Sequence, residues 1–335
     1  MNIDTTETSQ TTAPAIGYIP GYAQVFYRLF FGDCLIESDK IESGTVDLIL
    51  TDLPYGTVKD IKYPNENRKG YDTTAKWDTT IDTNEIYKIA NRILRKNGKM
   101  ILFAQQPFTT ELINKAIPNL PFNYGCIWEK DNFANALFVN KACVGYYEDI
   151  LVFSKTHDTE KSHVLINYFM DELNKTGLNQ NDINKILGNK MGGHYFTNGF
   201  QFCVPTEKNY IKLQTTGFFK TPYEELKEID NQFKKKFAST FNLWEGKKYK
   251  SNIFKHKKEY NGQHPTQKPV LLLEDLIKTF SNENDLVVDL TMGSGSTGVA
   301  CINTNRQFIG IEMNDNYFNI AEMRIKKAQR QNLFS

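Results

Sequence analysis

Apolar residues recur along the chain at the spacings of buried strands and amphipathic helices. The run at 46–50 predicts a buried strand, and residues 83–95 carry apolar side chains at helical spacing, with Asn97-Gly98 as the helix stop. Further strands are predicted at 100–103, 123–128, 147–153, 285–290 and 306–313, and further helices at 108–117, 269–281, 295–304 and 315–330. This alternation predicts an α/β fold, in which a mostly parallel sheet carries helices on its faces.

Residues 155–264 interrupt that pattern, because their apolar density falls and Asn, Lys and Gln dominate. Within them, residues 163–188 predict two helices joined by a glycine-containing turn, with Asn179 or Asn181 as the N-cap of the second helix. A helix-turn-helix that binds DNA and a plain helical hairpin both fit this pattern. Residues 231–262 predict a basic loop or extended arm.

The charge of the chain is balanced overall but unevenly distributed. Forty basic and 39 acidic residues leave a net charge of +1, yet residues 155–264 hold 18 lysines against 12 acids. Residues 231–258 alone hold nine lysines and one glutamate. A lysine-rich segment is usually just a solvated surface, but here the lysines are concentrated on one segment of an otherwise acidic chain, so a polyanionic partner is a second interpretation. The candidate DNA-contacting residues are Lys234, Lys235, Lys236, Lys247, Lys248 and Lys250.

Composition excludes several other classes of protein. No apolar run reaches 18 residues, so no membrane span is expected. The five cysteines and five histidines are scattered without ligand or disulfide spacing, so neither a bound metal nor a disulfide framework is expected. Residues 1–24 are polar and lack the apolar core of a secretory signal, which predicts a disordered tail and a cytoplasmic protein.

The first candidate site is the stretch "LTDLPYGT" at 50–57, where the strand over 46–50 ends. A proline cannot continue a central strand, so a plain turn is one explanation. The other is that Asp52, Pro54 and Tyr55 form a site at the end of the strand.

The second candidate site is a glycine loop. "VVDLTMGSGSTGVA" places Gly293, Gly295 and Gly298 between a strand and a helix, and Glu312 ends the following strand. This pattern predicts binding of a nucleotide-type cofactor and first suggests a nicotinamide dehydrogenase. Only 37 residues follow Gly298, however, so strands from 25–154 must complete the sheet. Asp52 would then lie in the crevice beside the glycine loop.

The whole set of motifs resembles the amino-group DNA methyltransferases that use S-adenosyl-L-methionine, in the order called class beta. The resemblance covers residues 28–330 and rests on the segments "FGDCL", "TDLPYG", "ILRKNGKMILFA", "YEDILVFSK", "HPTQKP", "DLTMGSGSTG" and "FIGIE". It implies a Rossmann-like, mostly parallel seven-stranded sheet with helices on both faces. The catalytic domain would comprise 25–154 and 265–335, and 155–264 would be an inserted target-recognition region.

The resemblance also implies roles for single residues. Asp33 would contact the adenine of the cofactor, and Glu312 would bind its ribose hydroxyls. Lys268, in "HPTQKP", would lie near the carboxylate of the methionine part. The residues expected to hold the methionine end are Asp289, Gly293, Ser294, Gly295 and Gly298.

The chemistry expected at 52–55 follows from the target atom. An exocyclic amino group of a base is a poor nucleophile, because its lone pair is delocalised into the ring. The Asp52 carboxylate and the Leu53 carbonyl can accept its two N–H groups and localise that lone pair, while Pro54 fixes the turn and Tyr55 stacks on the base. Leu53 stands where the common motif has a first proline. The base must be flipped out of the duplex, and the loop 57–80 with Tyr71 and Trp77 can close over it; Trp77 fits a core position equally well.

Four functions other than methylation of adenine N6 can be compared with the motifs. Methylation at cytosine C5 needs a Pro-Cys pair, and no cysteine here follows a proline. Methylation at cytosine N4 shares the same chemistry, although that subfamily usually has Ser in place of Asp52. A non-enzymatic helix-turn-helix regulator and a methyltransferase for RNA or small molecules are less consistent with the motifs. The expected partner is double-stranded DNA in a bacterial cell, with phage origin, a homodimer and a cognate restriction endonuclease left open.

Overall fold

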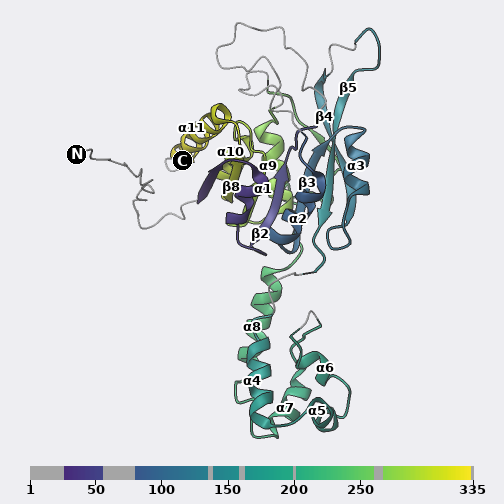
Figure 1. The fold of residues 1–335 in the computed structure, drawn as a ribbon, viewed down its shortest axis with the longest axis vertical. Coiled ribbons are helices and arrows are strands. Elements are labelled where there is room, and N and C mark those ends of the chain that lie inside the picture. Colours follow the sequence, from purple (N-terminus) through teal and green to yellow (C-terminus); the bar gives the residue numbers. More distant parts are fainter. Residues whose placement is uncertain are drawn as a thin grey trace, which may run out of the picture.

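The computed structural model describes residues 26–55, 80–134, 139–157, 163–198, 201–259 and 267–332. A sheet flanked by helices forms the body of the molecule (Figure 1). It has eight strands, in the order β1-β8-β7-β2-β3-β5-β4-β6. The strands are β1 (Tyr27–Phe31), β2 (Val46–Thr51), β3 (Leu94–Ala104), β4 (Phe122–Ala134), β5 (Gly145–Ser154), β6 (Ile253–Lys255), β7 (Leu286–Asp289) and β8 (Gln307–Glu312). Within the described strands of this sheet, the β3–β5 and β4–β5 pairs are antiparallel and the other pairs are parallel. Tyr71, Trp77 and His264 lie outside the described residues.

Helices cover both faces of the sheet, as the sequence predicted. One face carries α1 (Cys34–Glu37), the short 3-10 helix η1 (Ser38–Lys40), α2 (Thr83–Ile93) and α3 (Phe108–Asn114), and the other carries α9 (Val270–Phe280), α10 (Ser296–Asn303) and α11 (Asp315–Asn332). Strand β2 is buried between the two layers: Leu48 and Leu50 belong to the core under α9–α11, and Ile49 to the core under α2. This explains why its sequence is a continuous apolar run.

The predicted seven strands were one too few. Ile253 pairs with Ile127, so that β6, from the inserted segment, becomes the eighth strand at the edge of the sheet. Phe254 alone of its three residues is buried. A three-residue strand among lysines gives no periodic signal, and only its pairing with β4 defines it.

The predicted end of the helix over 83–95 was also wrong. Helix α2 ends at Ile93, and Leu94 already pairs with Val46 as the first residue of β3. Asn97, with φ 62°, and Gly98 therefore form an irregularity within the strand. A Cβ on Gly98 would lie 2.9 Å from the Arg95 carbonyl oxygen and 3.0 Å from that of Val46, so only glycine allows β2 to approach this closely.

The helical part of the insertion forms a lobe of its own. It consists of α4 (Ile166–Thr176), α5 (Gln180–Leu187), α6 (Gly192–Tyr195), α7 (Glu207–Gln214) and α8 (Tyr223–Lys236), which enclose a separate apolar core. Asn179 is the N-cap of α5 and forms a capping box with Asp182, whereas Asn181 lies inside the helix. Among the described residues, no helix is both long and apolar enough to cross a bilayer.

The lobe is attached on the side of the sheet where β2 begins, opposite to the side where β2 ends. The chain leaves β5 at Ser154, which pairs with Lys99 of β3, and Lys99 in turn lies opposite Leu48 near the start of β2. It returns where Asn97 Nδ2 donates to the Phe237 carbonyl at 2.7 Å and Arg95 Nη1 donates to that of Ala238 at 3.0 Å. Helices α4–α8 accordingly project away from the body (Figure 1).

The expected basic loop over 231–262 is largely ordered. Residues 231–236 complete α8, and the segment 241–259 runs along α9 and includes β6. Its contacts progress along that helix: the Asn242 N–H donates to the Thr279 carbonyl at one end, and Glu259 Oε1 accepts from the Val270 N–H at the other. This segment leads from the lobe back to the edge where β2 ends.

Candidate active site

Four acidic residues follow the carboxyl ends of neighbouring parallel strands. In sheet order they are Asp33 after β1, Glu312 at the end of β8, Asp289 at the end of β7 and Asp52 after β2. Ligands of such sheets bind at this edge, where the strand order reverses. Residues from the two ends of the sequence thus meet in one crevice.

Asp289 connects β2, β7 and α10. Its Oδ1 accepts from the Thr51 hydroxyl at 2.8 Å and from the Thr291 N–H at 3.1 Å, and its Oδ2 accepts from the Thr297 hydroxyl at 2.6 Å. Burial raises the pKa of Asp289 to about 6, although these hydrogen bonds favour the ionised form. Because its oxygens already hold the start of the glycine loop, Asp289 acts by positioning that loop.

The glycine loop is held in a conformation that requires glycine. Gly293 and Gly295 have φ values of 51° and 79°. The Glu312 carboxylate fixes the loop, because it accepts from the Gly293 N–H at 2.9 Å and from the Asn314 N–H at 2.8 Å. Burial raises the pKa of Glu312.

The other residues expected at the cofactor lie around this loop. Phe31 and Glu312 are in register, which places Asp33 next to Glu312; Asp33 Oδ1 also caps α1 by accepting from the Leu35 N–H at 2.9 Å. Arg324 of α11, which sequence reasoning missed, donates from Nη1 to the Ser294 carbonyl at 2.6 Å and to its hydroxyl at 2.9 Å. Two carboxylates, a glycine loop and a cation fit a cofactor that carries hydroxyl groups and an amino acid.

Asp52 lies beside a buried cluster of charges. Its Oδ1 is 3.0 Å from the Tyr55 hydroxyl, and its Oδ2 forms an ion pair with Lys268 Nζ. The Asp52 side chain remains 24% exposed, whereas that of Lys268 is 8% exposed. The sequence prediction for Lys268 is a position near the cofactor carboxylate, and the structure shows Asp52 as its ion-pair partner. Tyr55 packs against Phe108, with ring centroids 5.3 Å apart.

Glu148 of β5 is the other acid of this cluster. Its Oε1 lies 2.9 Å from the Tyr55 hydroxyl and 3.2 Å from Lys268 Nζ, and its Oε2 lies 3.1 Å from Lys130 Nζ. Glu148, Lys130 and Lys268 are all almost fully buried. The cluster therefore consists of two acids and two lysines, and Asp52 is its most exposed member.

The titration of the cluster follows from burial and from its charges. Burial raises the pKa of Asp52, and the negative charge of Glu148 adds to this effect. Burial opposes ionisation of Glu148 as well, but Lys268 and Lys130 overcome it and lower its pKa. The two carboxylates raise the pKa of Lys268 despite its burial. Glu148 and Lys268 therefore remain charged at neutral pH, whereas Asp52 takes up a proton at higher pH than a free aspartate does.

Sequence reasoning assigned no role to Glu148 or Lys130, although a signal was present. Glu148 alternates with Ile150 and Val152 on a buried strand face, and Lys130 alternates with Trp128 on the neighbouring strand. An acid on such a face needs a buried cation. Alternation alone could have paired these two residues.

The lysines proposed to contact DNA have different surroundings. Lys250 is buried and forms ion pairs with Glu245 and Asp275, so it anchors the segment 241–259 to α9. Lys234 forms an ion pair with Asp230, and Lys247 one with Glu245. Lys235 and Lys248 are exposed, and Lys236 is the last residue of α8.

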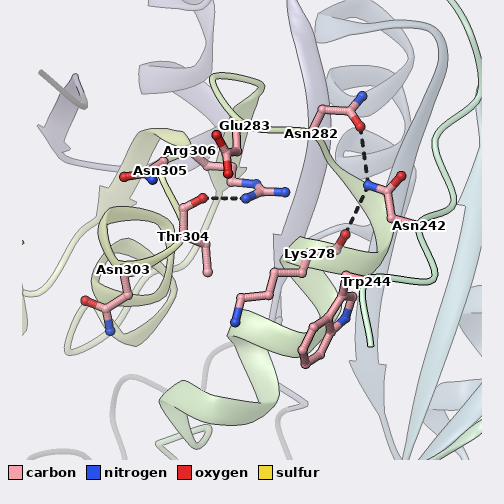
Figure 2. Close-up of a pocket in the computed structure, with 9 residues that line it drawn as sticks. All are labelled: Asn242, Trp244, Lys278, Asn282, Glu283, Asn303, Thr304, Asn305 and Arg306. Carbon is pink, nitrogen blue, oxygen red and sulfur yellow. Dashed lines mark hydrogen bonds between the residues drawn. The ribbon is translucent and has the colours of Figure 1, made fainter. Parts of the chain in front are cut away.

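A polar pocket of about 410 Å³ lies at the opposite edge of the sheet (Figure 2). It is lined by Asn242, Trp244, Lys278, Asn282, Glu283, Asn303, Thr304, Asn305 and Arg306. Its polar groups bind one another: Asn242 Nδ2 donates to the Lys278 carbonyl at 3.1 Å and to Asn282 Oδ1 at 3.3 Å, and Arg306 donates to the Thr304 carbonyl. These contacts stabilise the turns before β7 and β8, away from Asp52.

A family model agrees with this architecture. The model described as a DNA methylase of the N6/N4 type matches residues 46–323, which is most of the chain. The match includes β2, the inserted region and the glycine loop, and so spans both parts of the candidate site.

Individual relatives match to different extents. The Type II methyltransferase M2.LlaDCHI of Lactococcus lactis subsp. cremoris is 33% identical over 134 residues, which are 40% of this chain and 45% of that protein. This chain thus spans less than half the length of that relative. The DNA adenine methyltransferase YhdJ of Escherichia coli (strain K12) is 26% identical over 302 residues, or 90% of this chain and 83% of that protein. The crystal structure of the M1.HpyAVI–SAM complex covers 90% of this chain and 99% of its own, with a TM-score of 0.51 and 18% identity, which shows a common fold.

Proposed function

This chain belongs to the N6/N4 family of DNA methylases, and we propose that it transfers a methyl group from S-adenosyl-L-methionine to the exocyclic N6 of adenine in double-stranded DNA. The observation that carries the proposal is the position of Asp52. Its partly exposed carboxylate stands at the end of β2, one strand away from the glycine loop that follows β7.

S-Adenosyl-L-methionine is the methyl donor of this family, and when bound it supplies a methyl group on a sulfonium, which a nitrogen lone pair can attack. In our proposal Glu312 binds its ribose hydroxyls and Asp33 its adenine. The loop 293–298, positioned by Asp289, holds the amino-acid end. Arg324 supplies positive charge beside that loop, because Lys268 is committed to Asp52 and Glu148.

Asp52 and Leu53 activate the amino group in this mechanism. The Asp52 carboxylate and the Leu53 carbonyl accept its two N–H groups, which localises the nitrogen lone pair toward the methyl carbon. The backbone is held for this purpose, because the Thr291 hydroxyl donates to the Asp52 carbonyl at 2.9 Å. The bound cofactor would supply the methyl group to this lone pair and keep the sulfur as a neutral thioether, and Asp52 would accept the proton that the nitrogen loses. Positioning and electrostatics supply the acceleration.

Adenine is preferred over cytosine on two grounds. The cytosine-N4 methyltransferases that the chain resembles usually have Ser where this chain has Asp52. YhdJ, which matches 90% of this chain, is named a DNA adenine methyltransferase. An amino group inside a duplex cannot reach Asp52, so the base is flipped out of the stack.

The DNA lies along the edge that carries Asp52 in this proposal. Lys247 and Lys248 belong to the segment that leads to this edge, and they are the phosphate contacts we favour. Lys234, Lys235 and Lys236 belong to α8, and their contact with DNA stays a prediction, as do a homodimer, a cognate endonuclease and a bacterial or phage-derived cytoplasmic origin.

Expression in cells that lack DNA methylation of their own tests the proposal. Sequencing of their DNA with modification detection should reveal N6-methyladenine at one short sequence. Cells that express Asp52→Ala should show none. Detection of N4-methylcytosine at a fixed sequence would show that the target is cytosine and not adenine. Unmodified DNA in cells that contain the soluble protein would refute the proposal.

A further inference from the structure

Lys268 is shared between two acids. Its Nζ forms an ion pair with Asp52 Oδ2 and lies 3.2 Å from Glu148 Oε1. The Phe103 ring, with its centroid 4.9 Å from Nζ, borders the same space. Because the side chain is almost fully buried, the ammonium can shift between the two acids but cannot turn to solvent.

This sharing matters for the proposed reaction, on which the inference rests. Asp52 must accept an N–H group from the target base, yet the Tyr55 hydroxyl and Lys268 already lie on its two oxygens. An ammonium competes strongly with a neutral amino group for a carboxylate, because charge-assisted hydrogen bonds are the stronger ones. Efficient transfer therefore needs a second acceptor for Lys268.

We propose that Glu148 is a positioning residue for methyl transfer, which takes over Lys268 when the amino group of the target base binds Asp52. Glu148 lies within reach of Lys268 without any change of backbone. Its other oxygen is held by Lys130, so the acceptor for Lys268 is fixed in place. The Tyr55 hydroxyl, 2.9 Å from Glu148 and 3.0 Å from Asp52, can likewise donate to Glu148 and leave Asp52 free.

The charges around Asp52 make the proposal measurable. The titratable groups that face it are Lys268, Glu148, Tyr55 and Asp289, and Lys130 lies behind Glu148 as its ion-pair partner. The reaction needs ionised Asp52, so the transfer rate falls as the pH drops through its pKa. Removal of negative Glu148 lowers that pKa, and removal of positive Lys130 raises it.

The first test is Glu148→Gln in the full-length protein, with single-turnover methyl transfer to duplex DNA measured across pH. We expect the rate on the pH plateau to fall about tenfold to a hundredfold, as for a misplaced catalytic group. The acid limb of the profile should move to lower pH, while affinity for S-adenosyl-L-methionine stays unchanged. The matched control is Glu129→Gln, because Glu129 is an exposed acid of β4 that pairs with Lys255. This variant should change neither the plateau rate nor the position of the acid limb.

The second test is Lys130→Met, which leaves Glu148 with Lys268 as its remaining buried cation. Its acid limb should move in the opposite direction, to higher pH. Structural damage alone would lower both rates without opposite shifts. An unchanged rate in Glu148→Gln, or a slower rate with an unmoved acid limb, overturns the proposal. If Glu148→Gln does not fold, the direction of the Lys130→Met shift decides.

Wild-type protein separates this inference from the function on which it rests. Absence of transfer by wild-type protein would refute the proposed function. If wild-type protein transfers methyl groups and Glu148→Gln has the same pH profile of the transfer rate, the role of Glu148 is refuted and the proposed function stands.

Discussion

At the scale of residues, the substitution of leucine for the first proline of the motif has a structural compensation. The Leu53 side chain is 3% exposed and packs in the core under α2. On its N-terminal side, Thr291 holds the Asp52 carbonyl. Burial of Leu53 and one hydrogen bond to Asp52 therefore restrict the backbone of the site, as the ring of a proline at position 53 would.

Asp289 provides a pH-dependent test of the arrangement at the start of the glycine loop. Burial raises its pKa from 3.8 to about 6, so the folded state binds its proton more tightly than the unfolded state. Its ionisation thus costs stability as the pH rises from about 4 to 7, by about 3 kcal/mol in total. Relative to Asp289→Asn, wild-type protein should lose this amount of unfolding free energy over that range in urea titrations. If the difference in unfolding free energy between wild-type protein and Asp289→Asn does not vary with pH, the raised pKa of Asp289 is contradicted.

At the scale of elements, the glycine loop depends on the last helix. A Cβ on Gly295 would lie 2.8 Å from the Ala321 Cβ, so the loop packs directly on α11. The spacing of the glycines predicted the loop, but this contact with α11 follows only from the fold.

Gly295→Ala should reveal that contact. A positive φ costs alanine about 1–2 kcal/mol, and overpacking against Ala321 adds about 1–3 kcal/mol. Gly177→Ala is the matched control, because Gly177 also has a positive φ, of 67°, but open space around it. Denaturant titration should show the larger loss for Gly295→Ala, together with weaker binding of S-adenosyl-L-methionine. Equal losses in the two variants would argue against close packing.

The segment 241–259 can be tested through the salt dependence of DNA binding. Lys247→Gln with Lys248→Gln should weaken binding and reduce the slope of log affinity against log salt by about 1 for each lost phosphate contact. Lys88→Gln, an exposed lysine of α2 on the other face of the sheet, should leave the slope unchanged. Equal slopes for all three proteins would show that this segment does not touch DNA.

The sequence predicted most elements of the body and the meeting of Asp52 with the glycine loop, because strand periodicity and chain order determine both. It could not predict β6, whose three residues have no periodic pattern, or the pairing of Lys268 with Asp52 and Glu148. That pairing joins residues 216 and 120 positions apart, from three separate segments of the chain, and depends on how the antiparallel strand β5 lies beside β3.

At the scale of the whole molecule, the helical lobe is separated from the crevice. It has its own core and projects away from the body (Figure 1). Its return to the body is held by Arg95 and Asn97 of β3, whereas Asp52 follows the carboxyl end of β2. The two ends of the lobe meet at Asn97, whose N–H donates to the Lys155 carbonyl at 2.8 Å and whose Nδ2 donates to that of Phe237. The body is therefore continuous without the lobe.

Replacement of residues 163–236 by a short flexible linker should leave a folded body. Because the cofactor residues lie in the body, binding of S-adenosyl-L-methionine, measured by calorimetry, should be unchanged. DNA affinity or sequence preference should change if the lobe takes part in target recognition. Loss of cofactor binding in a soluble, folded variant would show that the lobe and the crevice are coupled.

The most direct measurement is single-turnover transfer of labelled methyl from S-adenosyl-L-methionine to duplex DNA, with the labelled nucleoside identified after digestion. Wild-type protein should yield N6-methyladenine, and so should Asp39→Ala, which removes an exposed acid of η1 that pairs with Arg92. Asp52→Ala should be slower by about a hundredfold or more, with cofactor affinity retained. Undiminished transfer by Asp52→Ala would contradict the account.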